Sequence, residues 1–270
     1  MLKAMKGAAP TQVGKEGEDS DEEGTASGLA AFGFGNLRVE MNGREVTDLE
    51  WRSEKSKEMF FFFLCNRRPL RKEEIVTALW PDLPDEKTGS LFHSNLYRLR
   101  KALYPECIAK DSGRYILDPQ GSFWFDVEEF QEALKEAEGL PADSDEGIAL
   151  MDKARALYTG QFASEFYSEW AETLRWQLEE QHMRLLTALA AACTERGEYK
   201  RSADLCQQIL TEDEYNEAAW YRLMSNYVLA GQMEAAAFCH RKYADIVSEG
   251  LGAEGIPEFE EICRQIREPR

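Results

Sequence analysis

Hydrophobic residues in the stretch 91–103 repeat with the period of an α-helix. Phe92, Leu96, Leu99 and Leu103 are spaced so that they fall on one side of a helix, which predicts an apolar stripe facing a core. Such a helix can enter a DNA major groove if its free side is suitable, but an ordinary surface helix with a solvated basic side has the same pattern. The neighbouring segments therefore decide between the two interpretations. The free side of the predicted helix carries polar and cationic side chains: His93, Ser94, Tyr97, Arg98 and Lys101.

Two further helices are predicted before this one. Ser53 can cap a helix whose apolar run at residues 59–65 is hydrophobic on several sides, as expected of a central buried helix. A buried strand is the alternative, but the polar lead-in and the length favour a helix. A second helix over residues 71–80 ends before Pro81. The third helix covers residues 86–103.

Two short β-hairpins are predicted on either side of these helices. Residues 31–41 alternate between apolar and polar positions and lead into Asn42-Gly43, which favours a type I′ hairpin turn because that turn needs positive φ at both central positions. After the third helix, residues 107–118 have the pattern of two strands around an Asp-Ser-Gly turn. Two hairpins flanking three helices are the layout of a winged helix-turn-helix domain, in which the third helix reads DNA and the last hairpin is the wing.

From residue 126 onward the pattern is almost entirely helical. Asp126 and Glu129 have the spacing of a capping box, which predicts that a helix starts there. Gly197 and Gly231 lie 34 residues apart, and the same shift aligns further apolar and small residues. The region therefore resembles tetratricopeptide repeats, with a generic helical bundle as the alternative. The predicted helices cover residues 128–139, 144–159, 166–196 (long enough to contain a break), 200–210, 217–230, 233–249 and 258–267.

Charge is distributed unevenly along the 270 residues, which carry a formal net charge of −18. Residues 1–29 are acidic and poor in large apolar groups, so we expect a disordered tail or a linker there. Residues 30–118 contain fifteen Lys/Arg and fourteen Asp/Glu, a net charge of +1, whereas residues 119–270 contain fourteen and thirty, a net charge of −16. An acidic C-terminal half weakens non-specific attraction to phosphates. Any DNA binding should therefore be modest and depend on a dimer or an assisting protein.

No segment has the features of a membrane span, a secretion signal or a catalytic site. The longest apolar run is far shorter than the roughly 18–20 residues that cross a bilayer, and the start of the chain lacks the apolar core of a signal peptide. The six cysteines contain no CxxC pair, so we expect reduced thiols in a cytoplasmic protein. No nucleophile motif, GxxxxGK[ST] phosphate loop or metal-ligand cluster is present. We therefore predict no enzymatic activity, no metal and no cofactor.

Three spaced motifs within residues 30–118 resemble the landmarks of OmpR-type DNA-binding domains. They are Leu79-Trp80-Pro81, the run LYRLRKAL at residues 96–103 and the run GRYIL at residues 113–117. The resemblance implies that the helix 86–103 lies in the major groove while the wing 107–118 reaches phosphates or the minor groove. The DNA-binding residues that it implies are Ser90, His93, Ser94, Tyr97, Arg98 and Lys101 on the helix, Lys110, Ser112 and Arg114 on the wing, and Arg71 and Lys72 at the start of the second helix.

Arg98 is the strongest of these candidates, because its planar guanidinium suits both base edges and phosphates. We expect Arg100, on the same helix, to pair with an acidic neighbour at the surface. Tyr97 has the alternative role of covering the wing. The acidic residues Asp82, Asp85 and Glu86 lie just before or at the start of the reading helix and leave few cations there. They motivate a second hypothesis, a protein-interaction adaptor whose winged helix does not read DNA and whose repeats bind a peptide or another regulator.

A winged helix followed directly by acidic helical repeats resembles the Streptomyces antibiotic regulatory protein group. In the second part the matching landmarks are DVEEF at residues 126–130, LYTGQF at residues 157–162 and Glu169-Trp170. The resemblance implies a transcription activator that binds repeated promoter sites in double-stranded DNA, associates with the nucleoid, and contacts RNA polymerase, another regulatory protein or a second protomer. The expected architecture is an α+β winged helix-turn-helix domain followed by an all-α tetratricopeptide-like repeat domain. Its expected parts are a tail at 1–29, the DNA-binding domain at 30–120 and a bacterial transcriptional activator domain at 124–270.

Overall fold

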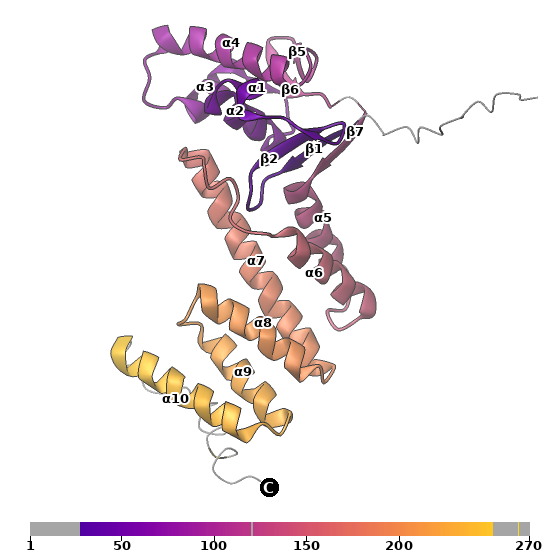
Figure 1. Ribbon diagram of the computed structural model, residues 1–270, viewed down its shortest axis with the longest axis vertical. Coiled ribbons are helices and arrows are strands. Elements are labelled where there is room, and N and C mark those ends of the chain that lie inside the picture. Colours follow the sequence, from indigo (N-terminus) through magenta and orange to yellow (C-terminus); the bar gives the residue numbers. More distant parts are fainter. Residues whose placement is uncertain (1–27, 120, 251–263, 265–270) are drawn as a thin grey trace, which may run out of the picture.

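The computed structural model describes residues 28–119, 121–250 and 264, with a sheet-and-helix part at one end of the molecule and paired helices at the other (Figure 1). A four-stranded sheet of order β3-β2-β1-β7 belongs to the first part. Asn42 and Gly43 between β2 and β3 have φ of 55° and 75°, the positive values that a type I′ turn needs, so the predicted hairpin is confirmed. The strands are β1 (Gly28–Phe32), β2 (Arg38–Met41), β3 (Arg44–Glu45) and β7 (Ser122–Phe125).

The strand β7 pairs parallel with β1, with Gly28 opposite Ser122. The sequence pattern does not predict β7, because four residues are too few to display an alternation. The pairing ties a segment near residue 122 to the first strand described. Gly28 and Leu29, which we expected in the tail, form the start of β1, and the rest of that predicted tail lies outside the described residues.

Four helices of the same part pack on one another, with α2 in contact with the other three. They are α1 (Asp48–Trp51), α2 (Glu54–Cys65), α3 (Lys72–Leu79) and α4 (Asp85–Ala102). The predicted central helix is α2, since every side chain from Ser56 to Leu64 is buried. The single turn α1 was not expected. Ser53 precedes α2 as predicted, but its hydroxyl donates to Asn95 Oδ1 of α4 (3.0 Å) instead of capping the helix. The three predicted helices are otherwise confirmed to within a residue or two at each end.

A second, three-stranded sheet has the order β4-β6-β5 and contains the wing. Its strands are β4 (Leu70–Arg71), β5 (Ile108–Asp111) and β6 (Arg114–Leu117). Ser112 and Gly113 at the tip have φ of 48° and 80°, again as in a type I′ turn. Two hairpins around three long helices confirm the predicted winged helix-turn-helix fold.

The remaining helices stack as antiparallel neighbours, confirming the predicted all-helical repeat part. Gly197 and Gly231 end α7 and α9 with left-handed φ of 76° and 73°, which explains why glycine recurs there at the repeat period. The helix predicted at 258–267 lies outside the described residues, apart from Arg264. Within the described segments, no helix is both long and apolar enough to cross a bilayer. The helices are α5 (Asp126–Glu138), α6 (Asp145–Leu157), α7 (Glu169–Glu195), α8 (Tyr199–Glu212), α9 (Glu217–Leu229) and α10 (Met233–Gly250).

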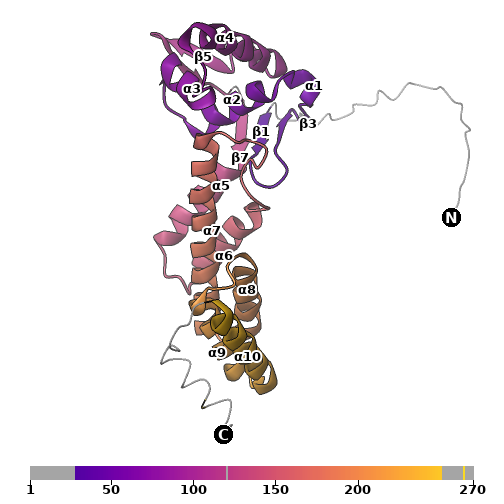
Figure 2. The ribbon, with the colours of Figure 1, turned by 90° about the vertical axis from the view of Figure 1, so that its left-hand side faces the viewer.

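The helix α7 is unbroken over 27 residues and runs from the winged helix to the repeats (Figure 2). At its start Trp170 Nε1 donates to Glu58 Oε1 of α2 (3.2 Å), and the Ser168 hydroxyl donates to the same carboxylate. Lys55 pairs with the other oxygen of Glu58 at 2.7 Å, so this buried charge is balanced. The contacts fasten α7 to the central helix of the winged-helix part.

Asp126 does not cap α5, so the capping-box prediction is wrong at this position. Phe125 occupies the cap position, and Asp126 is buried as the first helical residue. Its two carboxylate oxygens accept from the backbone N–H groups of Gly33 (2.7 Å) and Phe34 (3.0 Å). Burial raises the pKa of Asp126 to about 6, although these hydrogen bonds act in the opposite direction. The residue therefore anchors α5 to the loop after β1.

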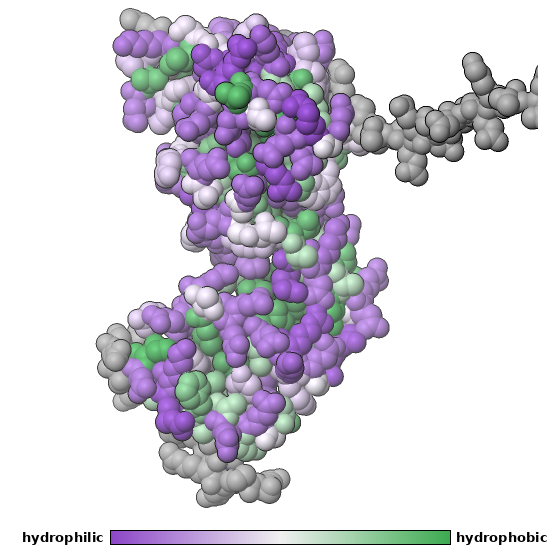
Figure 3. All heavy atoms as spheres, in the orientation of Figure 1, coloured by the Kyte–Doolittle hydropathy of each residue, from purple (hydrophilic) through white to green (hydrophobic). Residues whose placement is uncertain are grey.

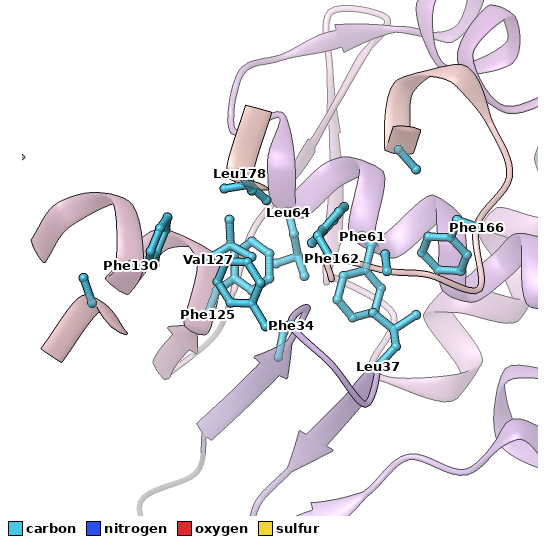
Figure 4. Close-up of a cluster of buried hydrophobic side chains, with 14 of the residues drawn as sticks. Phe34, Leu37, Phe61, Leu64, Phe125, Val127, Phe130, Phe162, Phe166 and Leu178 are labelled. Atoms are coloured by element: carbon cyan, nitrogen blue, oxygen red, sulfur yellow. The ribbon is translucent and has the colours of Figure 1, made fainter. Parts of the chain in front are cut away.

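One hydrophobic core joins the two parts of the chain (Figure 4). Phe34 forms a bridge with Phe162, and the Phe61 ring of α2 contacts those of Phe125 and Phe166. Because residues on both sides of positions 120–124 share this core, the division between the two expected domains crosses packed structure. That boundary stays a prediction.

Candidate nucleic-acid interface

The orientation of α4 is fixed by its buried side. Phe92 and Leu99 are fully buried, and Leu96 is nearly so, which confirms the predicted apolar stripe. Asn95 is also buried, and its Oδ1 accepts from Ser53 before α2 while its Nδ2 donates to the Leu91 carbonyl. A polar contact at one turn of the helix fixes its rotation more strictly than apolar packing does. The opposite side of α4 is therefore held facing outward.

The outward side carries the predicted reading residues. Tyr97 is 63% exposed, and Ser90, His93 and Lys101 are exposed as well, whereas Ser94 and Arg98 are half-buried. In both ribbon views α4 lies at the end of the molecule remote from α8, α9 and α10 (Figures 1 and 2). The surface at that end is largely hydrophilic on the face shown in Figure 3. The acidic helical repeats therefore leave this side of α4 uncovered.

The wing extends this surface. Lys110, Ser112 and Arg114 are all exposed, with Ser112 at the tip of the hairpin. The Lys110 Nζ lies 5.4 Å from the centre of the Tyr115 ring, a cation–π contact that orients the side chain. All three wing residues of the sequence prediction are accessible to a ligand.

Arg71 and Lys72, which lie where β4 meets α3 in the sequence, are also next to the wing and α4. Arg71 belongs to β4 and precedes the helix instead of starting it, and it lies directly opposite Arg114 of β6. Lys72 starts α3, and its Nζ lies 5.7 Å from the centre of the Phe92 ring of α4. The fold thus brings together cations from α4, the wing and the start of α3, although these segments are up to about 40 residues apart in the sequence.

None of these cations forms a side-chain ion pair within the described part of the chain. The side-chain nitrogens of Arg71, Lys72, Arg98, Lys101, Lys110 and Arg114 have no carboxylate oxygen within 4.0 Å there, although Arg114 is near enough to Glu74 to help lower the pKa of that carboxyl. The contrast is local, since the nearby Arg68 pairs with Glu74 at 2.7 Å. A solvated cation without a partner can meet a phosphate without first breaking an ion pair.

Arg100 has a different role from the one predicted. Its Nη2 donates to the backbone carbonyl of Ile108 at 2.6 Å, so it holds strand β5 of the wing against α4. The predicted pairing with an acidic neighbour is wrong, because the half-buried side chain faces the wing and not the surface. Residue type and spacing do not reveal this role, since the partner is a backbone oxygen that only the fold brings near.

Burial disfavours the thiolate form of the cysteines in the described residues. Cys65, Cys107, Cys193, Cys206 and Cys239 are all unpaired, and burial raises the pKa of the Cys107 and Cys206 thiols to about 11. Thiols with such pKa values are not nucleophilic near neutral pH. Cys263 lies outside the described residues. Across residues 28–119 and 121–250, no group of three or more His, Cys, Asp or Glu side chains could hold a metal ion.

Comparisons with known proteins bear on both parts of the chain. A family model described as "Bacterial transcriptional activator domain" matches residues 125–267. The chain is 23% identical over 195 residues to "Regulatory protein AfsR" of Streptomyces griseus and 22% identical over 195 residues to that of Streptomyces coelicolor. Each match covers 72% of this chain and 20% of the relative, so the chain spans about a fifth of the length of these relatives.

A solved structure has a similar fold. It is described as "Mycobacterium tuberculosis EmbR in complex with low affinity phosphopeptide" and superposes with a TM-score of 0.69 at 20% sequence identity. The match covers 88% of this chain and 64% of that chain. It therefore extends across both the winged helix and the helical repeats, and it concerns the fold alone.

Proposed function

The chain belongs to the bacterial transcriptional activator domain family, and on that basis we propose that it is a DNA-binding transcriptional regulator that activates its promoters. In this proposal α4 enters the major groove of double-stranded DNA, the wing contacts phosphates or the minor groove, and the start of α3 contacts the backbone. The helical repeats contact RNA polymerase, another regulatory protein or a second protomer. The protein would then be found with the nucleoid.

One observation carries the proposal: cations from three separate elements lie on one exposed surface without acidic partners among the described residues. The chain as a whole has a net charge of −18, so this surface is an exception and not a consequence of composition. Phosphate contacts supply most of the affinity for DNA, and base contacts supply the specificity. The acidic remainder of the molecule would repel DNA elsewhere and restrict contact to this surface.

The side chains divide into two roles by position. Arg98 and its neighbours Ser94 and Tyr97 lie on the helix that would face base edges, and Arg98 can form two parallel hydrogen bonds to a guanine. Ser90, His93 and Lys101 lie above and below them on the same side of α4. Phosphate contact is assigned to the remaining five residues: Arg71, Lys72, Lys110, Ser112 and Arg114.

Substitution of Arg98 tests the reading helix. Duplexes selected from a random pool by the whole protein would be titrated with wild type and with Arg98→Ala. We expect a loss of about 1–3 kcal/mol of specific binding, roughly 5- to 150-fold, because a base contact is removed. Arg44→Ala is the matched control, since Arg44 on β3 is exposed but paired with Glu50 and lies outside the proposed surface, and it should bind as wild type does. Equal affinity of Arg98→Ala and wild type would remove Arg98 from the interface.

Salt dependence separates the regulator from an adaptor that does not read DNA. Binding to genomic DNA should weaken steeply as salt rises, and Lys110→Gln should lower the slope by about one unit. No detectable binding at low salt would support the adaptor, which the acidic residues before α4 motivated. Co-purification with RNA polymerase and light scattering of the whole protein would test the partner and the second protomer.

A further inference from the structure

A cavity of about 520 Å³ lies among the helical repeats, between α5, α6 and α7. Residues of α5 and α7 supply most of its lining, and Met151 of α6 and the loop residues Leu140 and Ala142 also line it. It is separate from α4 and the wing, none of whose residues line it. Its volume is within the range of pockets that hold small organic ligands.

Most of the lining is apolar. Leu134 of α5, Met151 of α6 and Leu185 of α7 are among the larger apolar side chains, and Ala137 and Ala188 leave the space between the helices open. A leucine or phenylalanine at either alanine would fill this gap and complete the packing of α5 on α7. The cavity therefore offers an apolar ligand dispersion contacts that the helices do not make with each other.

The polar side chains that line the cavity include two cations, one acid and two glutamines: Lys135, Arg184, Glu138, Gln131 and Gln181. Lys135 has no carboxylate within 4.0 Å among the described residues, and Arg184 pairs only with Glu180, one turn away on the exposed side of α7. Glu138 is the one acid among the lining residues, although residues 119–270 have a net charge of −16. The Gln181 Oε1 is buried and has no hydrogen-bond donor, which is costly unless a bound molecule supplies one.

We propose that this cavity binds a small amphipathic organic acid. Its apolar body would lie against Leu134, Met151 and Leu185, its anionic group would contact Lys135 and Arg184, and a hydroxyl or N–H of the ligand would donate to Gln181 Oε1. An extended peptide fits less well, because the volume of about 520 Å³ is that of a pocket for a small molecule. The proposal does not rest on DNA binding and stands if the winged helix reads nothing.

The dye 1-anilinonaphthalene-8-sulfonate is a suitable probe, because it combines an apolar body, one sulfonate and one N–H. Titration of the whole protein should give saturable fluorescence at one site, which decanoate displaces and decyltrimethylammonium does not. The double variant Lys135→Gln/Arg184→Gln should bind the dye about tenfold more weakly. Ala188→Trp, which fills the cavity from an exposed position on α7, should abolish binding. The matched controls Lys200→Gln and Ala218→Trp, on α8 and α9, should bind as wild type does.

Gln181→Leu makes the test specific for the hydrogen bond. It should weaken binding of the dye about fivefold and leave the affinity for decanoate, which lacks a donor, unchanged. Far-ultraviolet circular dichroism would show that each variant is folded. Absence of saturable binding, unaltered binding by Ala188→Trp, displacement by the cation as readily as by decanoate, or displacement only by peptides would each overturn the proposal.

Discussion

Arginine and lysine occur in both halves of this molecule, but in two different environments. In the helical repeats Arg196 pairs with Asp145 at 2.6 Å and Arg201 pairs with Asp152 and Glu198. On the surface formed by α4, the wing and the start of α3, the cations have no such partners in the described residues. The difference lies in the partners of these cations and not in their number. It is the observation on which the proposed contact with DNA phosphates rests.

The largest expected effect comes from reversing the charge of two cations on α4 that have no carboxylate partner in the described residues. Arg98→Glu/Lys101→Glu should weaken DNA binding by more than about 100-fold, because two attractive contacts become repulsive, and should change the free energy of unfolding by less than about 0.5 kcal/mol. Gel shifts and urea titrations would measure the two quantities. Arg196→Glu/Arg201→Glu, at paired cations, should instead destabilise the fold with little effect on DNA binding. Similar behaviour of the two double variants would remove the distinction between the two environments.

Among single substitutions of cations, the largest decrease in the free energy of unfolding is expected for an arginine that donates to backbone carbonyl oxygens. Arg175 of α7 donates to the carbonyl oxygens of Phe162, Ala163 and Phe166, each at 2.8 Å. Arg175→Ala should lower the free energy of unfolding by about 2–3 kcal/mol, since three half-buried acceptors lose a charged donor. Arg98→Ala is the control in the same urea titration and should have almost no effect. A loss under about 0.5 kcal/mol for Arg175→Ala would contradict the role assigned to these contacts.

Two buried titratable groups, Asp126 of α5 and His182 of α7, should make opposite contributions to the response of the fold to acid. Burial and the nearby Arg155 lower the pKa of His182, stacked on Tyr158 in the repeats, from 6.5 to about 4. Between pH 6.5 and pH 4 the imidazole of His182 is protonated in the unfolded chain but neutral in the folded protein. The contribution of His182 to the free energy of unfolding is therefore lost as the pH falls from 6.5 to 4. The pKa of Asp126 is raised from 3.8 to about 6, so its contribution is lost as pH rises from 3.8 to 6.

Single variants should separate these opposing contributions. When the pH falls from 7 to 5, His182 should lower the free energy of unfolding of wild type by about 1–2 kcal/mol, and His182→Phe should not show this decrease. Over the same interval Asp126 should raise the free energy of unfolding by about the same amount, and Asp126→Asn should not show this increase. Urea titrations of each variant and of wild type at both pH values measure the difference. Parallel pH profiles for wild type and a variant would show that the corresponding group does not titrate as its burial requires.

The smallest expected effect on stability comes from neutralising one cation of the repeats that is paired with carboxylates. Arg201→Gln keeps the length of the side chain but removes its charge from Asp152 and Glu198, and it should cost about 0.5–1 kcal/mol of stability. The same exchange at Lys101, Lys101→Gln, should cost no stability and should weaken DNA binding. An equal loss of stability at both positions would indicate that Lys101 also has a partner in the folded protein.

The sequence predicted local features more fully than contacts between distant segments. Periodicity located α2 and α4 and the apolar stripe of α4, and Asn42-Gly43 and the spacing of Gly197 and Gly231 located turns, because each signal resides within a few residues. The family resemblance is also confirmed, by the match over residues 125–267. The pairing of β7 with β1 and the contact of Arg100 with Ile108 were missed, since periodicity reports that a residue is buried and not what it touches. The DNA-binding assignments of the eleven candidate residues stay a prediction, although the fold leaves their surface accessible.

The continuity of α7 has a consequence for the angle between the two halves. Its 27 residues correspond to about 40 Å, and each residue advances the helix by roughly 100° of rotation. One alanine inserted midway along α7 would therefore turn the repeats by about that angle around the helix axis relative to the wing. Four inserted residues would almost restore the original facing, at a separation about 6 Å greater. The helical phase of this one element is therefore one determinant of how α8, α9 and α10 face relative to α4.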